Sequence, residues 1–169
     1  MPDQKTLERA ARDKREGKSP STQAGEFVRE EMEHIREGKH GARSTEQAIA
    51  IGLSKARRAG VKLPPPKKGA TSAKTRKAAK LASAAGRSTA ARKKRPSAKR
   101  SRAVTKALRR EGRTAASKSA LSKHARTAAR KRSAASRSAS ARKAVRTKGP
   151  GARSAAALKA ARTRARRRR

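Results

Sequence analysis

Apolar residues recur at helical spacing in two segments of the first third of the chain, where they predict two helices. The clearest pattern covers residues 45–59. At about 100° per residue, one face of this segment carries small or apolar side chains, namely Ala48, Ile49, Gly52, Leu53 and Ala56. Ser44 is suited to cap the start of the helix, and Gln47 completes a capping box. Gly60 is suited to end it, and the prolines at 64–66 prevent it from restarting.

A second helix is predicted at 20–37, with Pro20 near its first position. A glycine-containing loop separates it from the helix at 45–59, so the two should form an αα-hairpin. The residues expected to pack within this hairpin, or to mediate self-association, are Phe27, Val28, Met32, Ile35, Ile49, Gly52, Leu53 and Ala56. A weaker helix is predicted at 4–16, where charges of opposite sign alternate at i,i+4 spacing.

The predicted hairpin has few large apolar side chains for its size. Ordering each residue costs about 1.5 kcal/mol, which the burial of these side chains does not comfortably offset. We therefore expect a domain at 1–63 that is either marginally stable by itself or completed by self-association. The face around Gly52 is the place where a second helix can approach most closely.

Four glutamates line the opposite face of the second predicted helix: Glu26, Glu30, Glu33 and Glu37. We interpret this stripe as a solvated surface, because an exposed helix face supplies neither burial nor a pocket. An alternative is that the stripe contacts the basic part of the chain and competes with nucleic acid for it.

Charge divides the chain at the prolines. Of its 51 lysine and arginine residues, 37 lie at 67–169, together with a single acidic residue, Glu111. Low hydrophobicity with high net charge is typical of disorder, although Ala, Lys and Arg favour helix locally. The expected fold class is all-α: a small N-terminal helical hairpin domain at 1–63, a proline-rich linker at 64–69, and a low-complexity tail at 70–169. We expect this tail to be disordered alone and to become helical on binding.

The density of cations predicts nucleic-acid binding through phosphate contacts. The residues that we assign to this role are Arg57, Arg58, Lys67, Lys68, Arg92, Lys93, Lys94, Arg95, Lys99, Arg100, Arg102, Arg109, Arg110, Arg130, Lys131, Arg132, Arg142, Lys143, Arg166, Arg167, Arg168 and Arg169. The tail has no aromatic residue that could stack on bases. Contacts to phosphate position a protein without reading sequence, so binding should be independent of sequence.

Candidate catalytic and metal-binding residues are scarce. The chain has no cysteine, no phosphate-binding glycine motif and no nucleophile elbow. His34, His40 and His124 have no matched carboxylate or nucleophile cluster around them in the sequence, so we predict no enzyme activity, no metal site and no cofactor. Without a long apolar run or a secretory signal, we expect a cytoplasmic protein with no membrane partner.

Two stretches carry a resemblance. The segments at 18–31 and 36–60, with the Gln-Ala-Ile-Ala-Ile-Gly-Leu-Ser sequence at 47–54 as the most specific element, resemble a family of short basic bacterial proteins of unknown function. This resemblance covers roughly residues 1–66 and implies a bacterial origin without assigning an activity. The tail at 67–169 resembles in composition the Lys/Ala/Ser-rich tails of linker histones and bacterial histone-like proteins.

The function that we expect is sequence-independent DNA binding that condenses or bridges DNA in the nucleoid. One alternative is a protein associated with RNA or the ribosome, whose basic extension contacts ribosomal RNA. Another is an adaptor whose helical hairpin binds a protein partner while the tail serves as a nucleic-acid anchor.

Overall fold

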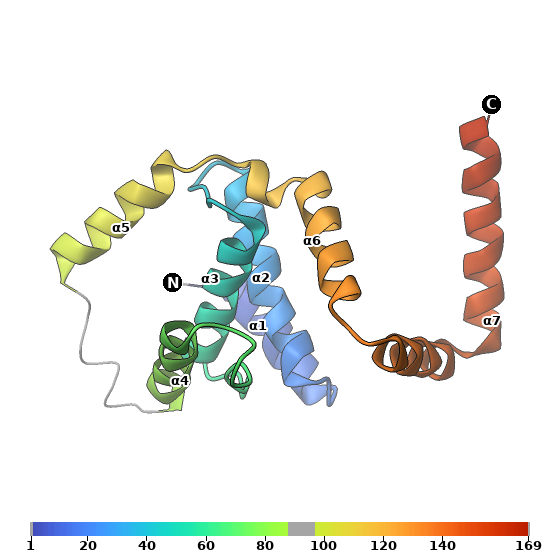
Figure 1. Cartoon of the computed structure of the whole chain (residues 1–169), viewed down its shortest axis with the longest axis horizontal. Helices are drawn as coiled ribbons and strands as arrows, with labels where there is room; N and C mark the ends of the chain where they lie inside the picture. The colour runs from blue at the N-terminus through green and yellow to red at the C-terminus, as the bar shows by residue number, and fades with distance from the viewer. Residues whose placement is uncertain (1, 88–96, 169) are drawn as a thin grey trace. The chain divides into compact units, whose positions relative to one another are not determined.

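The computed structural model describes residues 2–87 and 97–168, and these residues form helices (Figure 1). The elements are α1 (Gln4–Arg15), α2 (Pro20–Arg36), α3 (Thr45–Arg58), α4 (Ala73–Arg87), α5 (Ala98–Arg110), the 3-10 helix η2 (Thr114–Ala116), α6 (Lys118–Arg130) and α7 (Ala134–Arg168). The prediction of an all-α protein is confirmed. Across the described residues, no helix is long and apolar enough to span a membrane.

Local sequence accounts for where α2 and α3 begin and end. The Ser19 side chain accepts a hydrogen bond from the backbone N–H of Thr22 at the start of α2. At the start of α3, Ser44 Oγ accepts from the Gln47 N–H at 3.2 Å. Gln47 Oε1 in turn accepts from the N–H of Arg43, one residue before the cap. These side chains satisfy backbone donors that a helix leaves unpaired at its first turn.

The core of the hairpin forms where α2 crosses α3. A Cβ atom at Gly52 would lie 2.7 Å from Val28 Cα and 3.0 Å from the Phe27 carbonyl oxygen, so glycine allows the two backbones to meet. Phe27, Ala24 and Ala56 form one buried cluster with Ala10 of α1. Leu53 packs against it from the edge. The Gly52 face is therefore occupied by α2 of the same chain.

A second cluster lies at the other end of the hairpin. It contains Met32, Ile35, Ala42 and Ala48, with Val28 and Ile49 packed beside it. The same cluster includes Ala115 and Ala116, which are buried although they come from the tail. All eight predicted packing residues thus belong to one of these two clusters or to the close approach at Gly52.

The tail is attached to the hairpin by backbone hydrogen bonds. The N–H of Gly41 donates to the Leu108 carbonyl at 2.9 Å, and the N–H of Ala42 donates to the Gly112 carbonyl at 3.2 Å. The side chains of Arg36 and Thr45 donate to the carbonyls of Ala116 and Ala115, at 2.9 and 2.8 Å. We call residues 108–124 the docked segment, because its backbone and its two buried alanines complete the second cluster.

The structure therefore differs from the predicted disordered tail, since most of the tail's described residues are helical. Alanine, lysine and arginine have high helix propensity, and serine caps supply helix starts, as where Ser97 Oγ accepts from the Arg100 N–H. The methyl groups of Ala115 and Ala116 are buried apolar surface. The prediction of a disordered tail counted only large apolar side chains and so left these two residues out.

The predicted linker at 64–69 lies between α3 and α4. Beyond it, α4 packs against α3, and a Cβ atom at Gly86 would lie 2.0 Å from the Arg57 carbonyl oxygen. By its contacts, the chain divides into a unit at Met1–His124 and a unit at Ala125–Arg169.

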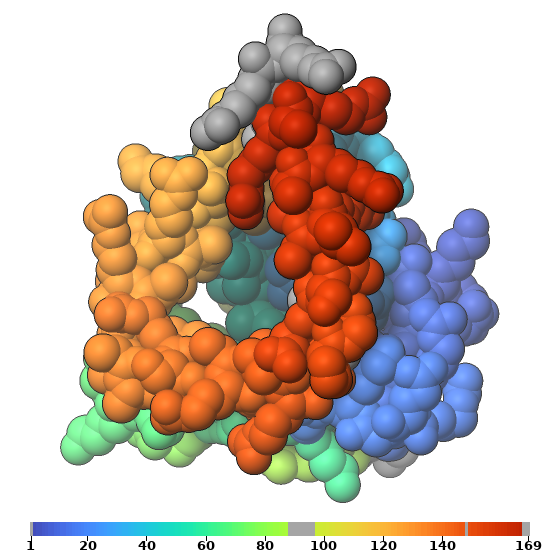
Figure 2. All heavy atoms as spheres, turned by 90° about the vertical axis from the view of Figure 1, so that its right-hand side faces the viewer, coloured from blue at the N-terminus to red at the C-terminus, as the bar shows by residue number. Residues whose placement is uncertain are grey.

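The second unit consists mainly of α7. This helix is interrupted at Gly149, whose φ of 67° and ψ of 171° are not helical, and Pro150 follows. Both segments on either side of the interruption expose their side chains on the face seen in Figure 2. Glycine adopts positive φ without strain, and proline lacks the N–H that a continuous helix needs. The residues at 149–150 therefore account for the interruption of α7.

Candidate nucleic-acid interface and buried ionic cluster

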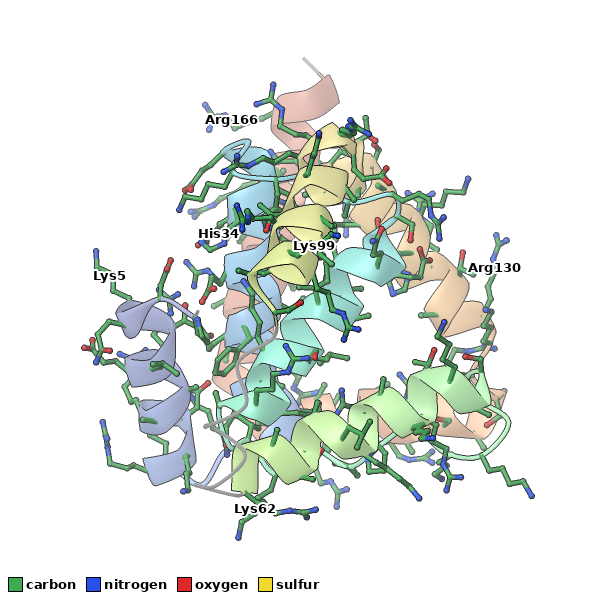
Figure 3. All side chains as sticks on the ribbon, turned by 90° about the vertical axis from the view of Figure 1, so that its left-hand side faces the viewer. Lys5, His34, Lys62, Lys99, Arg130 and Arg166 are labelled. Atoms are coloured by element: carbon green, nitrogen blue, oxygen red, sulfur yellow. The ribbon has the colours of Figure 1, made fainter. Side chains whose placement is uncertain are left out.

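Most of the cations assigned to nucleic-acid binding are exposed. Those whose side chains are described as exposed are Arg58, Lys67, Lys68, Lys99, Arg100, Arg102, Arg109, Arg110, Arg130, Lys131, Arg132, Arg142, Lys143 and Arg166. Figure 3 shows Arg130 and Arg166 extending away from the ribbon. Residues 92–95 and 169, and the side chains at 167–168, lie outside what the structure describes.

Helix α5 gathers most of its cations on one face. At about 100° per residue, five of its six basic side chains fall within an arc of about 100°: Lys99, Arg102, Lys106, Arg109 and Arg110. We call these five residues the α5 basic face. Together with Ser101 and Thr105, four of them line a shallow open hollow along the helix. Guanidinium and ammonium groups beside hydroxyl donors are the groups that bind phosphate oxygens in nucleic-acid complexes.

The assignment of Arg57 to nucleic-acid binding is wrong. Among the described members of the predicted set it alone is buried, with 7% of its surface exposed. Its Nη2 donates to the carbonyl oxygen of Pro64 at 3.2 Å, and burial lowers the pKa of the guanidinium. Arg57 therefore holds the predicted linker against α3 and is not available to a phosphate, whereas Arg58 is exposed.

The glutamate stripe is a solvated surface only in part, because the side chains of Glu33 and Glu37 are 43% and 56% exposed whereas Glu30 is buried. Glu30 is 2% exposed, and Glu26 Oε2 lies 2.7 Å from Arg9 Nε of α1. Glu33 and Glu37 pair with Arg29 and Lys39. In the described part of the chain, the ion-pair partners of these four glutamates thus come from the N-terminal region rather than from the tail.

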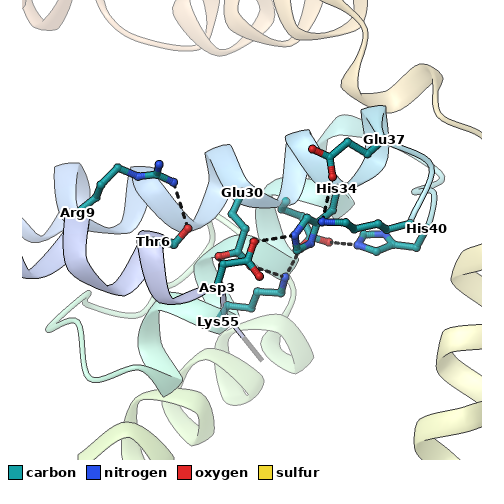
Figure 4. Close-up of polar contacts among 10 residues, drawn as sticks. Asp3, Thr6, Arg9, Glu30, His34, Glu37, His40 and Lys55 are labelled. Carbon is teal, nitrogen blue, oxygen red and sulfur yellow. Dashed lines mark hydrogen bonds and ion pairs between the residues drawn. The ribbon is translucent and has the colours of Figure 1, made fainter.

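The histidines have carboxylate neighbours that the sequence order conceals. His34 Nε2 lies 3.2 Å from Asp3 Oδ2 (Figure 4). His40 Nε2 lies 3.3 Å from Glu31 Oε1. His124 Nδ1 lies 3.0 Å from Glu46 Oε1. The prediction that the histidines lack matched carboxylates is therefore wrong for all three.

The first two of these pairs belong to one buried ionic cluster. It consists of Asp3, Glu30, Glu31, His34, His40 and Lys55. Helix α2 supplies Glu30, Glu31 and His34 from its last two turns, and the turn at Gly38, whose φ is 78°, brings His40 back toward Glu31. Glu31 is fully buried, a costly location for a carboxylate unless cations or donors compensate it.

Lys55 supplies part of that compensation from α3. Its Nζ lies 2.7 Å from Glu31 Oε2 and 3.1 Å from Glu30 Oε1. Burial by itself lowers the pKa of Lys55, but pairing with Glu31 and Glu30 outweighs it, so the pKa is raised and the amine stays charged. The hydrogen bond from His34 likewise lowers the pKa of Asp3.

Sequence reasoning missed this cluster although one local signal was present. Glu31 and His34 are spaced i,i+3 on one helix face, the spacing with which helices present paired metal ligands. The contributions of Asp3, His40 and Lys55 depend on how three elements pack, which spacing alone does not report. Four pairs of the cluster join residues more than 20 positions apart.

Comparison with known proteins gives a family match for the N-terminal part of the chain only. No curated protein and no solved structure matches the chain. Residues 3–68 match the model of a family of unknown function. This range contains α1–α3 and the whole ionic cluster and ends in the predicted linker, so the docked segment and the α5 basic face lie outside it. Over residues 3–68 the chain is therefore similar to the family of unknown function DUF6496, as the resemblance in its sequence predicts.

Proposed function

We propose that this protein binds double-stranded DNA without sequence preference and condenses or bridges it, acting in the nucleoid in the manner of a histone-like protein. The observation that carries the proposal is the exposure of the tail's cations, and above all the α5 basic face. Cations that neutralise phosphates release the counterions of DNA, which supplies most of the affinity of sequence-independent binding.

The side chains that read bases are largely missing from this surface. Residues 67–169 contain no Asn and no Gln, the residues that pair with adenine in the major groove. Arginine can read guanine, but the tail's arginines are spread through a low-complexity sequence. These features support contacts that follow the phosphate backbone.

DNA should also stabilise the helices of the tail. Arg102, Lys106 and Arg110 follow one another at i,i+4 on α5, where like charges destabilise a helix by about 0.2–0.5 kcal/mol per pair. Phosphates that bind these side chains remove the repulsion. The expected result is that the helical circular dichroism of the protein persists to a higher temperature when duplex DNA is added.

The test compares two matched variants of the full chain after removal of co-purifying nucleic acid. One replaces Arg102, Lys106, Arg109 and Arg110 of the α5 basic face with glutamine. The control replaces the exposed α1 residues Lys5, Arg12, Lys14 and Arg15 with glutamine, so both variants have four fewer positive charges. Affinity for duplexes of unrelated sequence is measured as a function of salt concentration.

We expect the first variant to lower the slope of log affinity against log salt by about 0.9 for each phosphate that the protein no longer neutralises, equally for every sequence. The control variant should change this slope by less than the contribution of one neutralised phosphate. An equal change in both variants would show that only net charge matters. Binding that is confined to RNA of matched length would favour the ribosomal alternative, and a strong preference for one DNA sequence would contradict the proposal.

A further inference from the structure

The buried ionic cluster contains the donor set of a transition-metal site. Donor atoms of Glu31, His34 and His40 lie within 4.8 Å of one another, as do those of Asp3, Glu30 and His34. The side chain of Glu31 is fully buried, and those of His34 and His40 are 13% and 18% exposed. Two imidazoles and a carboxylate are ligands that Zn²⁺ and related divalent ions bind readily.

The orientation of His40 points to a cation between it and Glu31. His40 Nδ1 lies 3.2 Å from the carbonyl oxygen of Gly41, and a carbonyl oxygen can only accept, so Nδ1 carries a hydrogen. In the neutral ring, Nε2 then presents its lone pair toward Glu31 Oε1, which lies 3.3 Å away. Two acceptors face each other at this distance only when a proton or a metal ion lies between them.

The hydrogen bond from Nδ1 to a backbone carbonyl is also the contact that orients metal-binding histidines. It fixes the tautomer that leaves Nε2 free to ligate. His34 has a corresponding partner, because Asp3 Oδ2 lies 3.2 Å from its Nε2. A carboxylate in this place orients a ligating imidazole or serves as an additional ligand.

The charges of the cluster leave room for a divalent cation. Asp3, Glu30 and Glu31 supply three carboxylates, and Lys55 is the cation that contacts the two buried ones. Lys55 contacts Glu31 at Oε2, and Oε1 is the oxygen that lies next to His40. The lysine and a metal ion can thus share Glu31, one on each oxygen.

We propose that Glu31, His34 and His40 bind a divalent transition-metal ion of the Zn²⁺ class, with Asp3 as orienting group or fourth ligand. The ion links α2 to the loop that follows it and, through Asp3, to the start of α1. A metal that binds only the folded state stabilises it. Small domains with few apolar side chains commonly rely on such a link. This inference does not depend on the proposed DNA binding.

The test uses the untagged full chain, freed of nucleic acid and stripped of metal by a chelator. Zn²⁺ is titrated in competition with a chromophoric chelator, and Co²⁺ is added separately because its visible absorption reports coordination geometry. The variants Glu31→Gln, His34→Gln and His40→Gln are compared with His124→Gln. His124 is a matched control because it also pairs with a carboxylate, Glu46, outside the cluster.

We expect the wild-type chain to take up one Zn²⁺ and to unfold at a higher temperature when it is bound. Each cluster variant should weaken uptake by more than about 100-fold, since replacing only the groups that orient ligands costs 10–100-fold. His124→Gln should bind like the wild type, and Mg²⁺ should not compete. His40 is partly exposed, so His40→Gln should keep its helical circular dichroism even if Glu31→Gln does not fold.

Three results would overturn the proposal. The first is a chain that takes up no stoichiometric Zn²⁺, with nitrogen NMR showing His40 doubly protonated at neutral pH, so that a proton alone fills the gap. The second is uptake that His34→Gln and His40→Gln retain. The third is uptake that Mg²⁺ displaces or that His124→Gln abolishes, which would indicate general binding to acidic or histidine side chains.

Discussion

Gly52 sets how closely the two main helices of the N-terminal part can approach. A methyl group at this position would lie 2.7 Å from Val28 Cα and 3.0 Å from the Phe27 carbonyl oxygen. Both obstacles are backbone atoms, which cannot move away without shifting the whole of α2. The close contact therefore depends on the missing side chain rather than on glycine's backbone freedom.

We predict that Gly52→Ala destabilises the protein by about 1–3 kcal/mol, the usual cost of overpacking a core, although alanine favours helix. The matched control is Gly25→Ala, because Gly25 lies within α2 with no atom within 4 Å of its would-be Cβ. This control should gain up to about 1 kcal/mol from helix propensity. Urea unfolding followed by circular dichroism measures both. Similar effects of the two substitutions would contradict the close approach.

The pair between Glu46 and His124 gives the docked segment a pH dependence. A hydrogen bond from His124 lowers the pKa of Glu46, with help from Ser44 and the start of α3. Because the pKa is lower in the folded state, the stabilisation is present above the unfolded value, about 4.3, and is lost as pH falls through the folded value. The side chain is well exposed, so the effect should be small.

We predict that hydrogen-exchange protection of α6 near His124 decreases as pH falls below about 4.3, after correction for intrinsic exchange. Glu46→Gln should remove this acid-dependent step. Glu8→Gln, on the exposed face of α1, should retain it. If Glu46→Gln and the wild type lose protection in parallel, the pair does not hold the segment.

At the scale of elements, the docked segment depends on close backbone contact at Gly41. A Cβ atom there would lie 1.9 Å from the Glu111 carbonyl oxygen and 2.7 Å from that of Gly112. The Gly41 N–H also donates to Leu108. Any side chain at Gly41 therefore pushes the segment away from the loop between α2 and α3.

We predict that Gly41→Ala releases residues 108–124 while α1, α2 and α3 remain folded. Amides of the released segment, such as that of Leu121, should exchange faster by at least tenfold, and those in the middle of α3 should not change. Gly151→Ala is the control, because no atom lies within 4 Å of its would-be Cβ. Unchanged exchange at Leu121 in Gly41→Ala would show that the docking is not formed in solution.

These elements also show what could be predicted from the sequence. The cap at Ser44, the proline at the start of α2 and the apolar spacing on α2 and α3 are local signals, and helices form where they indicate. The docked segment offers no such signal, because it binds through backbone carbonyls and two alanine methyl groups. The ionic cluster depends on long-range packing that brings Asp3, His34 and Lys55 together.

At the scale of the whole molecule, the cations of the tail are shared between two units. The unit at Met1–His124 carries the α5 basic face, and the unit at Ala125–Arg169 carries the interrupted helix α7. The second unit contains no acidic residue. Two cationic units joined in one chain can bind two DNA segments, because the first contact raises the effective concentration of the second.

We therefore predict that the full chain bridges two differently labelled DNA duplexes, whereas an equimolar mixture of fragments 1–124 and 125–169 does not. Both fragments should still bind DNA, with salt slopes that add up roughly to that of the full chain, because each neutralised phosphate contributes separately to the slope. Capture of one duplex on beads and measurement of the second label tests this. The mixture has the same total charge and nearly the same composition as the intact chain, so equal bridging by the mixture would show a polycation effect that needs no covalent connection. Bridging by fragment 1–124 alone would instead indicate self-association of the first unit.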